Sequence, residues 1–141
     1  MLIKDDKMKI TTGIDIIEVD RIKKTVEKLG ENFLNRIYTE KEIQYCYKSE
    51  IMKYQHLAAR FAVKEAVFKS ISEFVNKNDN LWKDIEVLND DCGKPKLNVE
   101  KLSKNISKIA NIKIKDIDVS ISHIKEYAVA SVVAVFEEID F

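Results

Sequence analysis

The chain has 141 residues, of which 45% are apolar and 34% charged, a composition typical of a globular protein and not of a disordered one. Its 24 basic residues balance its 24 acidic ones, which gives no support to a general role in binding nucleic acid or a membrane surface. The length fits a single domain, residues 1–141, with room for a core but little for enclosing a large ligand.

Cysteine use and hydropathy indicate a cytoplasmic protein. Cys46 and Cys92 stand alone and form no CxxC pair, so we expect neither a disulfide scaffold nor a cysteine metal site. No apolar run approaches the ~20 residues of a membrane-spanning helix. Residues 1–9 are charged where a signal peptide would be apolar.

The first predicted element is a β-strand at residues 10–17, where isoleucines alternate with other residues. The alternation places Asp15 on the face opposite the isoleucines, together with Gly13, the only glycine of the strand. A glycine inside a strand often marks the close approach of a ligand or another backbone. The sequence therefore predicts that something lies against this face beside Asp15.

Three helices are predicted between this strand and residue 50. Asp20 is expected to cap the first, which ends at Gly30. Its buried side would carry Ile22, Val26 and Leu29, and its other side carries Arg21, Lys24 and Lys28. A short helix is expected at residues 33–38. Thr39 and Glu42 then form a capping box for the third, with Ile43 and Tyr47 facing inward.

Residues 51–75 contain no Gly or Pro and predict a long helix. At ~100° per residue, its apolar stripe comprises Leu57, Ala58, Phe61, Ala62 and Phe68. Glu65 lies in the middle of that stripe, with Lys69 one turn further on. An unpaired carboxylate on an apolar face costs roughly several kcal/mol, so it is either protonated or matched by a cation. Two interpretations stay open here, an ordinary Glu–Lys pair and a functional carboxylate.

The second half of the chain predicts the rest of the sheet. We expect a strand at residues 82–89, a turn at 89–95 and a helix capped by Asn98 that carries Val99, Leu102, Ile106 and Ile109. Strands at 117–123 and 127–136 form a hairpin, and the second is apolar on both faces, which places it in the centre of the sheet. The order of elements predicts an α+β fold, with an antiparallel sheet packed against a long helix and shorter helices.

Among common catalytic motifs, GxxxxGK[ST], GxGxxG, GxSxG and HExxH are all missing from the sequence. We expect His56 at the surface, whereas His123, at a strand end, is better placed to meet a ligand. Two carboxylates with open positions are the usual protein share of a Mg2+ site. Asp15 and Glu65 would fit that share. Lys69 and Arg60 (a second base on the long helix) would then neutralise phosphate oxygens.

Four segments in order resemble the holo-[acyl-carrier-protein] synthases, the small bacterial 4'-phosphopantetheinyl transferases. They are GIDIIEVDRI at 13–22, RFAVKEAVFK at 60–69, WKDIEV with GKP at 82–87 and 93–95, and SH with YA at 122–123 and 127–128. The resemblance covers nearly the whole chain. It implies transfer of the 4'-phosphopantetheine arm of coenzyme A to a serine of apo-acyl carrier protein, with release of adenosine 3',5'-bisphosphate, in support of fatty acid biosynthesis.

The resemblance also implies roles for particular residues. Asp15 and Glu65 would hold Mg2+, and Lys69 would contact the phosphates as the third catalytic residue. The nucleotide end of coenzyme A would be held by Arg60, Lys94 and His123. Carrier proteins are acidic, so Arg21, on the basic side of the first helix, is the expected contact to that partner. Single-domain members of the family are homotrimers whose sites are shared between neighbours.

Two features depart from the family pattern. Members commonly have a Gly-containing turn soon after the lysine that matches Lys69, but residues 70–73 here are compatible with a helix. Met8 lies where many members begin, so residues 1–7 are either an extension or a misassigned start. Two other functions stay open on the residues alone. One is a non-catalytic α+β binding module with Glu65 and Lys69 as a structural pair, and the other is a different Mg2+-dependent phosphoryl-transfer enzyme.

Overall fold

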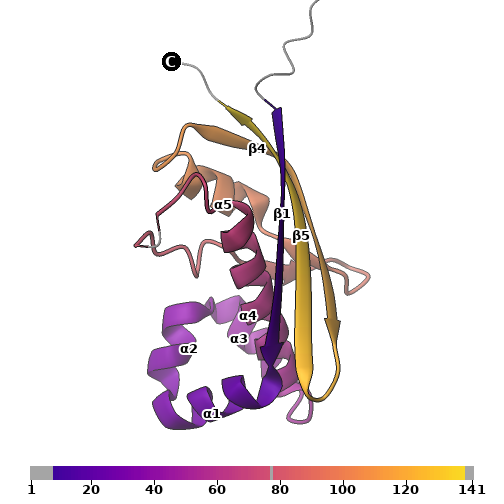
Figure 1. Ribbon diagram of the computed structural model, residues 1–141. Coiled ribbons are helices and arrows are strands. Elements are labelled where there is room, and N and C mark those ends of the chain that lie inside the picture. The colour runs from indigo at the N-terminus through magenta and orange to yellow at the C-terminus, as the bar shows by residue number, and fades with distance from the viewer. Residues whose placement is uncertain (1–7, 77, 139–141) are drawn as a thin grey trace, which may run out of the picture.

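The computed structural model describes residues 8–76 and 78–138, so the two interpretations of residues 1–7, an extension or a misassigned start, fall outside the described residues. Ten elements follow one another (Figure 1): β1 (Met8–Glu18), α1 (Val19–Leu29), α2 (Glu31–Ile37), α3 (Glu40–Cys46), α4 (Lys53–Ser70), β2 (Val87–Asn89), β3 (Pro95–Leu97), α5 (Val99–Ile106), β4 (Ile112–His123) and β5 (Tyr127–Glu138). This is the predicted α+β arrangement. None of the described helices is long and apolar enough to cross a membrane.

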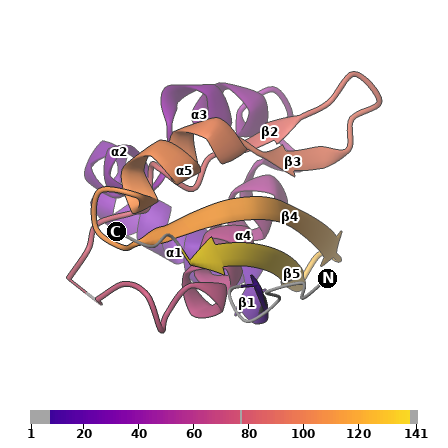
Figure 2. The same cartoon turned by 90° about the horizontal axis from the view of Figure 1, so that it is seen from above.

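The main sheet has the order β1-β5-β4, and both pairings are antiparallel. The central position predicted for β5 is therefore confirmed, as is the β4–β5 hairpin. In Figure 1 the helices gather on one side of this sheet, with α4 against β1 and β5. The small β2–β3 sheet projects as a hairpin on the side of α3 and α5 (Figure 2).

Small residues allow α4 to lie close to the sheet. Both the core-facing side of β5 and the facing side of α4 carry buried alanines. On the strand these are Ala128, Ala130 and Ala134, and on the helix they are Ala58, Ala59, Ala62 and Ala66. Gly13 makes the closest approach, because a Cβ built on it would lie 1.8 Å from the carbonyl oxygen of Ala66. Real Cβ atoms do not tolerate that distance, so only glycine fits. The backbone predicted to approach this strand is that of α4.

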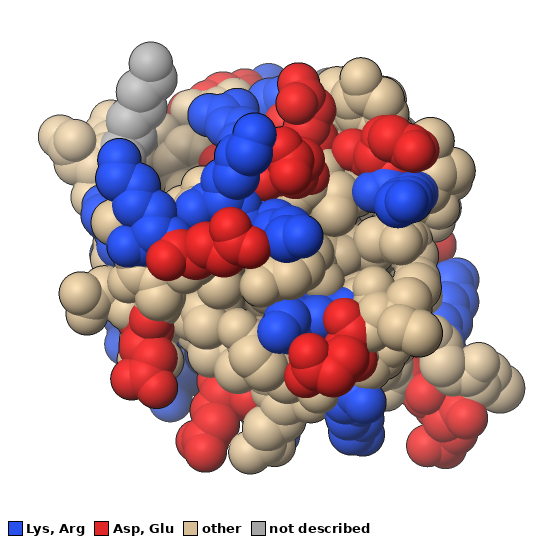
Figure 3. All heavy atoms as spheres, turned by 90° about the horizontal axis from the view of Figure 1, so that it is seen from below, with Lys and Arg blue, Asp and Glu red and all other residues tan. Residues whose placement is uncertain are grey.

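The isoleucine face of β1 points away from the core. Ile10, Ile14 and Ile16 are 70%, 64% and 63% exposed, and Val133 on the neighbouring strand is 50% exposed. Together these four residues form what we call the open sheet face. Clustered exposed aliphatic residues are a feature that interaction surfaces of soluble proteins share. At the α1 end of the molecule, by contrast, basic and acidic side chains intermix (Figure 3), in line with the balanced charge.

Several predicted boundaries and burials were wrong, for local reasons. The N-cap of α1 is Glu18, and Asp20 instead sits in the first turn, where it pairs with Lys24 at 2.8 Å.

The long helix ends at Ser70 and not near residue 75. There the hydroxyls of Ser70 and Ser72 donate to the carbonyl oxygens of Val67 and Lys69 (2.7 and 2.8 Å), in competition with helix hydrogen bonds. The side chains of Leu29, Tyr47 and Ile109 proved to be exposed.

The strand predicted at residues 82–89 is mostly absent, because regular pairing begins only at Val87. Residues 81–86 form turns instead, and two of their carbonyl oxygens turn inward to a buried lysine described below. The helix capped by Asn98 is confirmed, since Asn98 Oδ1 accepts a hydrogen bond from the backbone N–H of Lys101 at 3.2 Å. The capping box of α3 is confirmed as well.

Candidate active site

The fold brings together the three residues predicted to act on phosphates. Asp15 lies on β1, and Glu65 and Lys69 lie on α4, the helix that β1 crosses through Gly13. Lys69 Nζ donates to Asp15 Oδ1 at 3.1 Å and to the carbonyl oxygen of Ile14 at 2.9 Å. Burial raises the pKa of Glu65, and the nearby Asp15 carboxylate raises this pKa further, while Lys69 opposes both effects.

The charge in this cluster is unbalanced in a way that suits a cation. The carboxylates of Asp15 and Glu65 share one lysine, Lys69. The pKa of Glu65 is raised because burial and the negative charge of Asp15 together outweigh the positive charge of Lys69. Within the described ranges, no group of three or more His, Cys, Asp or Glu side chains could hold a metal ion. Asp15 and Glu65 together offer two carboxylates here, which is the share that Mg2+ usually takes from protein before water and substrate complete its shell.

A cavity of about 290 Å3 opens beside Glu65. Its walls are mostly apolar and come from α4 and the turns that follow it: Phe68, Leu81, Trp82 and Ile85, with Lys64 and Asp79. Trp82 is held in place by Phe61, whose ring stacks on it with centroids 5.3 Å apart. The cavity could take a largely apolar ligand group next to the Glu65 carboxylate.

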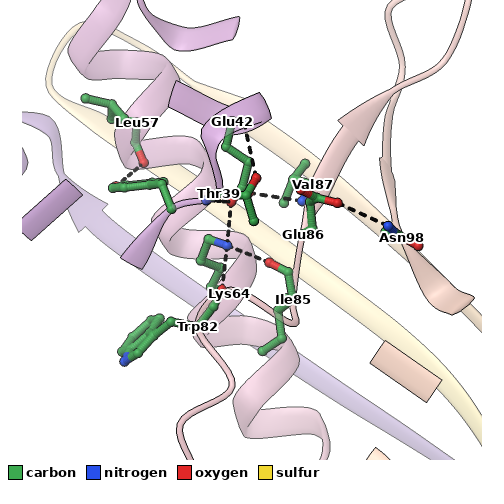
Figure 4. Close-up of polar contacts among 10 residues, drawn as sticks. Thr39, Glu42, Leu57, Lys64, Trp82, Ile85, Glu86, Val87 and Asn98 are labelled. Carbon is green, nitrogen blue, oxygen red and sulfur yellow. Dashed lines mark hydrogen bonds and ion pairs between the residues drawn. The ribbon is translucent and has the colours of Figure 1, made fainter. Parts of the chain in front are cut away.

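A fully buried ion pair that the sequence interpretation overlooked supports this cavity (Figure 4). The side chains of Lys64 and Glu42 are both 0% exposed, and Lys64 Nζ donates to Glu42 Oε1 at 2.8 Å. Nζ also donates to the carbonyl oxygens of Trp82 and Ile85, each at 2.6 Å. Burial lowers the pKa of Lys64 even though Glu42 opposes that shift. One ammonium group thus joins α4, α3 and the turn that walls the cavity.

Glu42 has its own set of donors. Besides Lys64, it accepts from the backbone N–H of Thr39 at 2.9 Å, which is the capping box, and from the backbone N–H of Val87 at 3.0 Å. A signal for this pair was present in the sequence. Lys64 falls on the same helical stripe as Leu57 and Phe68, at spacings of seven and four residues, so the argument applied to Glu65 applies to it equally.

The residues expected at the nucleotide end of coenzyme A lie around the first half of α4 and the neighbouring hairpin. Arg60 is only 3% exposed; its Nη2 donates to Asn89 Oδ1 at 2.7 Å, and its guanidinium lies 4.1 Å from the centre of the Tyr45 ring. Arg60 Nε has no hydrogen-bond partner among the residues that the structure describes. Lys94 is exposed, and its Nζ lies 4.0 Å from Asp118 Oδ1.

The two histidines are neighbours, and the surface position expected for His56 was wrong. Its ring is half-buried between those of Tyr45 and His123, with centroid distances of 5.3 and 5.9 Å. Burial lowers the pKa of His56, and the charges of Arg60 and His123 add to this effect. His123 Nδ1 is 2.9 Å from Gln55 Oε1. Arg60, His56 and His123 therefore form one group.

Arg21 is exposed on α1 beside a hollow of about 500 Å3 lined by Glu18, Asp20, Arg21, Lys24, Thr25, Lys28 and Leu29. Asp20 is paired with Lys24, whereas Arg21 forms no ion pair within the described part of the chain. Within the described ranges, the Arg21 guanidinium is therefore not held by a neighbouring carboxylate.

Comparisons with known proteins identify the family of the chain. The model of the 4'-phosphopantetheinyl transferase superfamily matches residues 11–132. The holo-[acyl-carrier-protein] synthase of Ruminiclostridium cellulolyticum is 42% identical over 123 residues, which are 87% of this chain and 90% of the relative. That of Thermodesulfovibrio yellowstonii is 46% identical over 121 residues, 86% of this chain and 94% of the relative.

Solved structures give the same result. The holo-(acyl-carrier-protein) synthase from Bacillus anthracis in complex with CoA (3',5'-ADP) superposes with a TM-score of 0.68 at 37% identity, covering 94% of this chain and 99% of that one. The Helicobacter pylori enzyme in complex with coenzyme A has a TM-score of 0.68 at 30% identity, covering 87% and 98%. The chain therefore belongs to the 4'-phosphopantetheinyl transferase superfamily and, within it, to the holo-[acyl-carrier-protein] synthases.

Proposed function

We propose that the protein transfers the 4'-phosphopantetheine group of coenzyme A to a serine of apo-acyl carrier protein in the cytoplasm, in support of fatty acid biosynthesis. The serine oxygen forms a bond to the phosphorus next to the pantetheine, and the bond from that phosphorus to adenosine 3',5'-bisphosphate breaks. The observation that carries this proposal is the meeting of Asp15, Glu65 and Lys69, with Glu65 lining an apolar cavity, in a chain of this family.

Asp15 and Glu65 are the residues that would hold Mg2+. The unbalanced charge around Glu65 and the two-carboxylate donor set fit a hard cation. When bound, Mg2+ stabilises the negative charge that builds on the transferred phosphoryl group. The ammonium of Lys69 is half-exposed beside Asp15, so it is placed to bind a phosphate oxygen of coenzyme A. We assign Asp15, Glu65 and Lys69 as the catalytic residues.

The other end of coenzyme A is assigned to Arg60, Lys94 and His123. A guanidinium with an unpartnered Nε, an exposed ammonium and an imidazole are all donors for phosphate oxygens. Arg60 and Glu65 lie on the same helix, so α4 connects the nucleotide end of this assignment to the reacting end.

One assay separates this function from its two rivals. Labelled coenzyme A is incubated with the protein and an apo-carrier protein, with and without Mg2+, and the label on the carrier is measured. We expect Mg2+-dependent labelling and release of adenosine 3',5'-bisphosphate. A non-catalytic binding module would leave the carrier unlabelled. A different Mg2+-dependent phosphoryl-transfer enzyme would also leave it unlabelled, but would consume another phosphate donor.

We further propose that the active form is a homotrimer with sites between protomers, assembled through the open sheet face. The support is the exposed aliphatic surface of Ile10, Ile14, Ile16 and Val133, together with a chain too short to enclose coenzyme A alone.

Ile10→Asp is expected to dissociate the trimer, because it places a charge in a surface that assembly would remove from water. Light scattering should give three times the protomer mass for the parent and the protomer mass for the variant. Ile109→Asp, at an apolar residue that is 43% exposed and outside the open sheet face, is the matched control and should remain trimeric. A parent that is fully active as a monomer would contradict the shared site.

Arg21→Glu is expected to raise KM for the carrier protein about tenfold, or ~1.4 kcal/mol, with little change in KM for coenzyme A. Attraction between the basic side of α1 and an acidic carrier acts mainly on association, and salt screens it over a Debye length of ~8 Å near physiological ionic strength. The defect should therefore shrink as salt rises. Lys104→Glu, an exposed base on α5, is the control. Equal losses for both substrates would mean that Arg21 supports the fold or the nucleotide site.

A further inference from the structure

The buried guanidinium of Arg60 is held by neutral groups. Its Nη2 donates to Asn89 Oδ1 at 2.7 Å, and its Cζ lies 4.1 Å from the centre of the Tyr45 ring. Among the described residues Arg60 forms no ion pair, although it is only 3% exposed. Burying a cation without an internal anion is costly, and an anionic ligand offsets that cost. The charge of Arg60 is therefore available to a ligand.

The amide of Asn89 is used at both of its ends. Asn89 is the last residue of β2, in the hairpin that projects beside α3 and α5 (Figure 2). Its Oδ1 accepts from Arg60, and its Nδ2 donates to the carbonyl oxygen of Gly93 at 3.0 Å. An amide oxygen only accepts and an amide NH2 group only donates, so a flipped amide would lose both bonds. The two contacts together fix the orientation of the Asn89 side chain.

The turn that contains Gly93 is held by hydrogen bonds of its own. Asp90 Oδ1 accepts from the backbone N–H groups of Cys92 and Lys94, both at 2.9 Å. The N–H of Asp90 donates to the carbonyl oxygen of Lys94, and the N–H of Gly93 to that of Asp90, again at 2.9 Å. Gly93 takes a φ of 81°, which glycine adopts without strain. The turn is thus a fixed support from which Asn89 reaches Arg60.

We propose that Asn89 is a positioning residue, which aims the Arg60 guanidinium at a phosphate of the nucleotide end of coenzyme A and, being neutral, leaves the charge of Arg60 to that phosphate. The identity of the ligand rests on the proposed function, whereas the contacts that hold Arg60 do not. A carboxylate at position 89 would also accept from the guanidinium, but it would compete with the phosphate for its charge. An amide is therefore the acceptor that serves binding.

Calorimetric binding of adenosine 3',5'-bisphosphate, the nucleotide end alone, tests the proposal. Asn89→Leu removes the acceptor at similar size and should raise Kd roughly fivefold. Asn89→Asp keeps an acceptor oxygen, yet its charge should raise Kd roughly tenfold. Asn105→Leu is the matched control, because this half-buried amide on α5 also forms two hydrogen bonds, and Kd should not change. A parental Kd in either Asn89 variant, or a parent that does not bind the nucleotide, would overturn the proposal.

Motion of the Arg60 side chain gives a readout that needs neither ligand nor activity. The Nε–H order parameter from NMR reports motion on the picosecond to nanosecond scale, and the chain has only three arginines to assign, Arg21, Arg36 and Arg60. We expect Arg60 to be rigid in the parent and in Asn89→Asp, and mobile in Asn89→Leu. A rigid side chain that binds the nucleotide poorly, as expected for Asn89→Asp, separates the effect of charge from that of position. Equal order parameters in the parent and Asn89→Leu would overturn the proposal.

Transfer kinetics show whether Asn89 acts through Arg60. Asn89→Leu should raise KM for coenzyme A by the same factor as Kd, and kcat and KM for the carrier protein should stay within about twofold. In the Arg60→Met background it should add nothing to the loss, because the guanidinium it positions is gone. Additive losses would overturn the proposal. If the parent fails to label a carrier protein while Kd and the order parameters behave as expected, only the proposed function has failed.

Discussion

Asp15→Asn and Glu65→Gln should each reduce phosphopantetheine transfer by roughly a hundredfold or more while the protein stays folded. Each change removes one of the two carboxylates assigned to a single cation. The double variant should therefore be hardly worse than either single one. Because burial and Asp15 raise the pKa of Glu65, the charged form of Glu65 is disfavoured in the fold. We expect the Tm of Glu65→Gln to be unchanged or higher.

Steady-state kinetics at saturating Mg2+ measures the loss of phosphopantetheine transfer, and thermal unfolding measures the Tm. Glu100→Gln, at an exposed position of α5, is the matched control and should retain full activity. Near-normal transfer by Asp15→Asn or by Glu65→Gln would contradict the assignment of these two carboxylates to Mg2+. A variant that loses both activity and Tm would mean that the carboxylates support the fold.

Lys64→Met should lower the free energy of unfolding by about 3–5 kcal/mol, because it leaves the Glu42 carboxylate buried without its cation. Both side chains are 0% exposed, so water cannot replace the lost partner. Adding Glu42→Gln removes the stranded charge and keeps an oxygen that accepts from the N–H of Thr39. The double variant should therefore be more stable than Lys64→Met alone, though below the parent, since the carbonyl oxygens of Trp82 and Ile85 lose their donor.

Denaturant unfolding of the parent, the two single variants and the double variant measures this coupling. Lys24→Met, which breaks the exposed pair with Asp20, should cause no measurable change. A double variant that is no more stable than Lys64→Met would show that the charge of Glu42 is not what destabilises the single variant.

The sequence was sufficient wherever a local pattern has one physical solution. β5 is apolar on both faces, and it lies at the centre of the sheet as that pattern predicts. Thr39 and Glu42 form the capping box that their spacing predicts. Gly13 marked a close backbone approach, which proved to be α4 against β1. Glu65 stood out because a charge on an apolar stripe needs a reason, and the structure places it beside Asp15 and Lys69.

The remaining features depend on partners that a local pattern does not identify. The acceptors of Lys64 come from a capping residue and from irregular turns, 18 to 22 residues away in sequence. Periodicity assigns two faces to β1 but does not say which one meets the core. The open isoleucine face therefore became evident only once α4 was seen to cover the other side. His56 was misplaced for the same reason, since Tyr45 and His123 reach it from other elements.

The pairing of β1 with β5 sets the order in which the site can be assembled during synthesis. β1 leaves the ribosome first of all the described elements, yet its hydrogen-bonded neighbour is the last of them, with Gly13 opposite Val132 and Asp15 opposite Ala130. Pairing between strands so distant in the chain is slow to form and closes late in folding. The helices can collapse earlier, but until β5 emerges the strand that carries Asp15 has no hydrogen-bonded partner in the sheet. We therefore expect a chain truncated before β5 to be inactive, because its β1 strand lacks the neighbour that fixes Asp15 in the sheet.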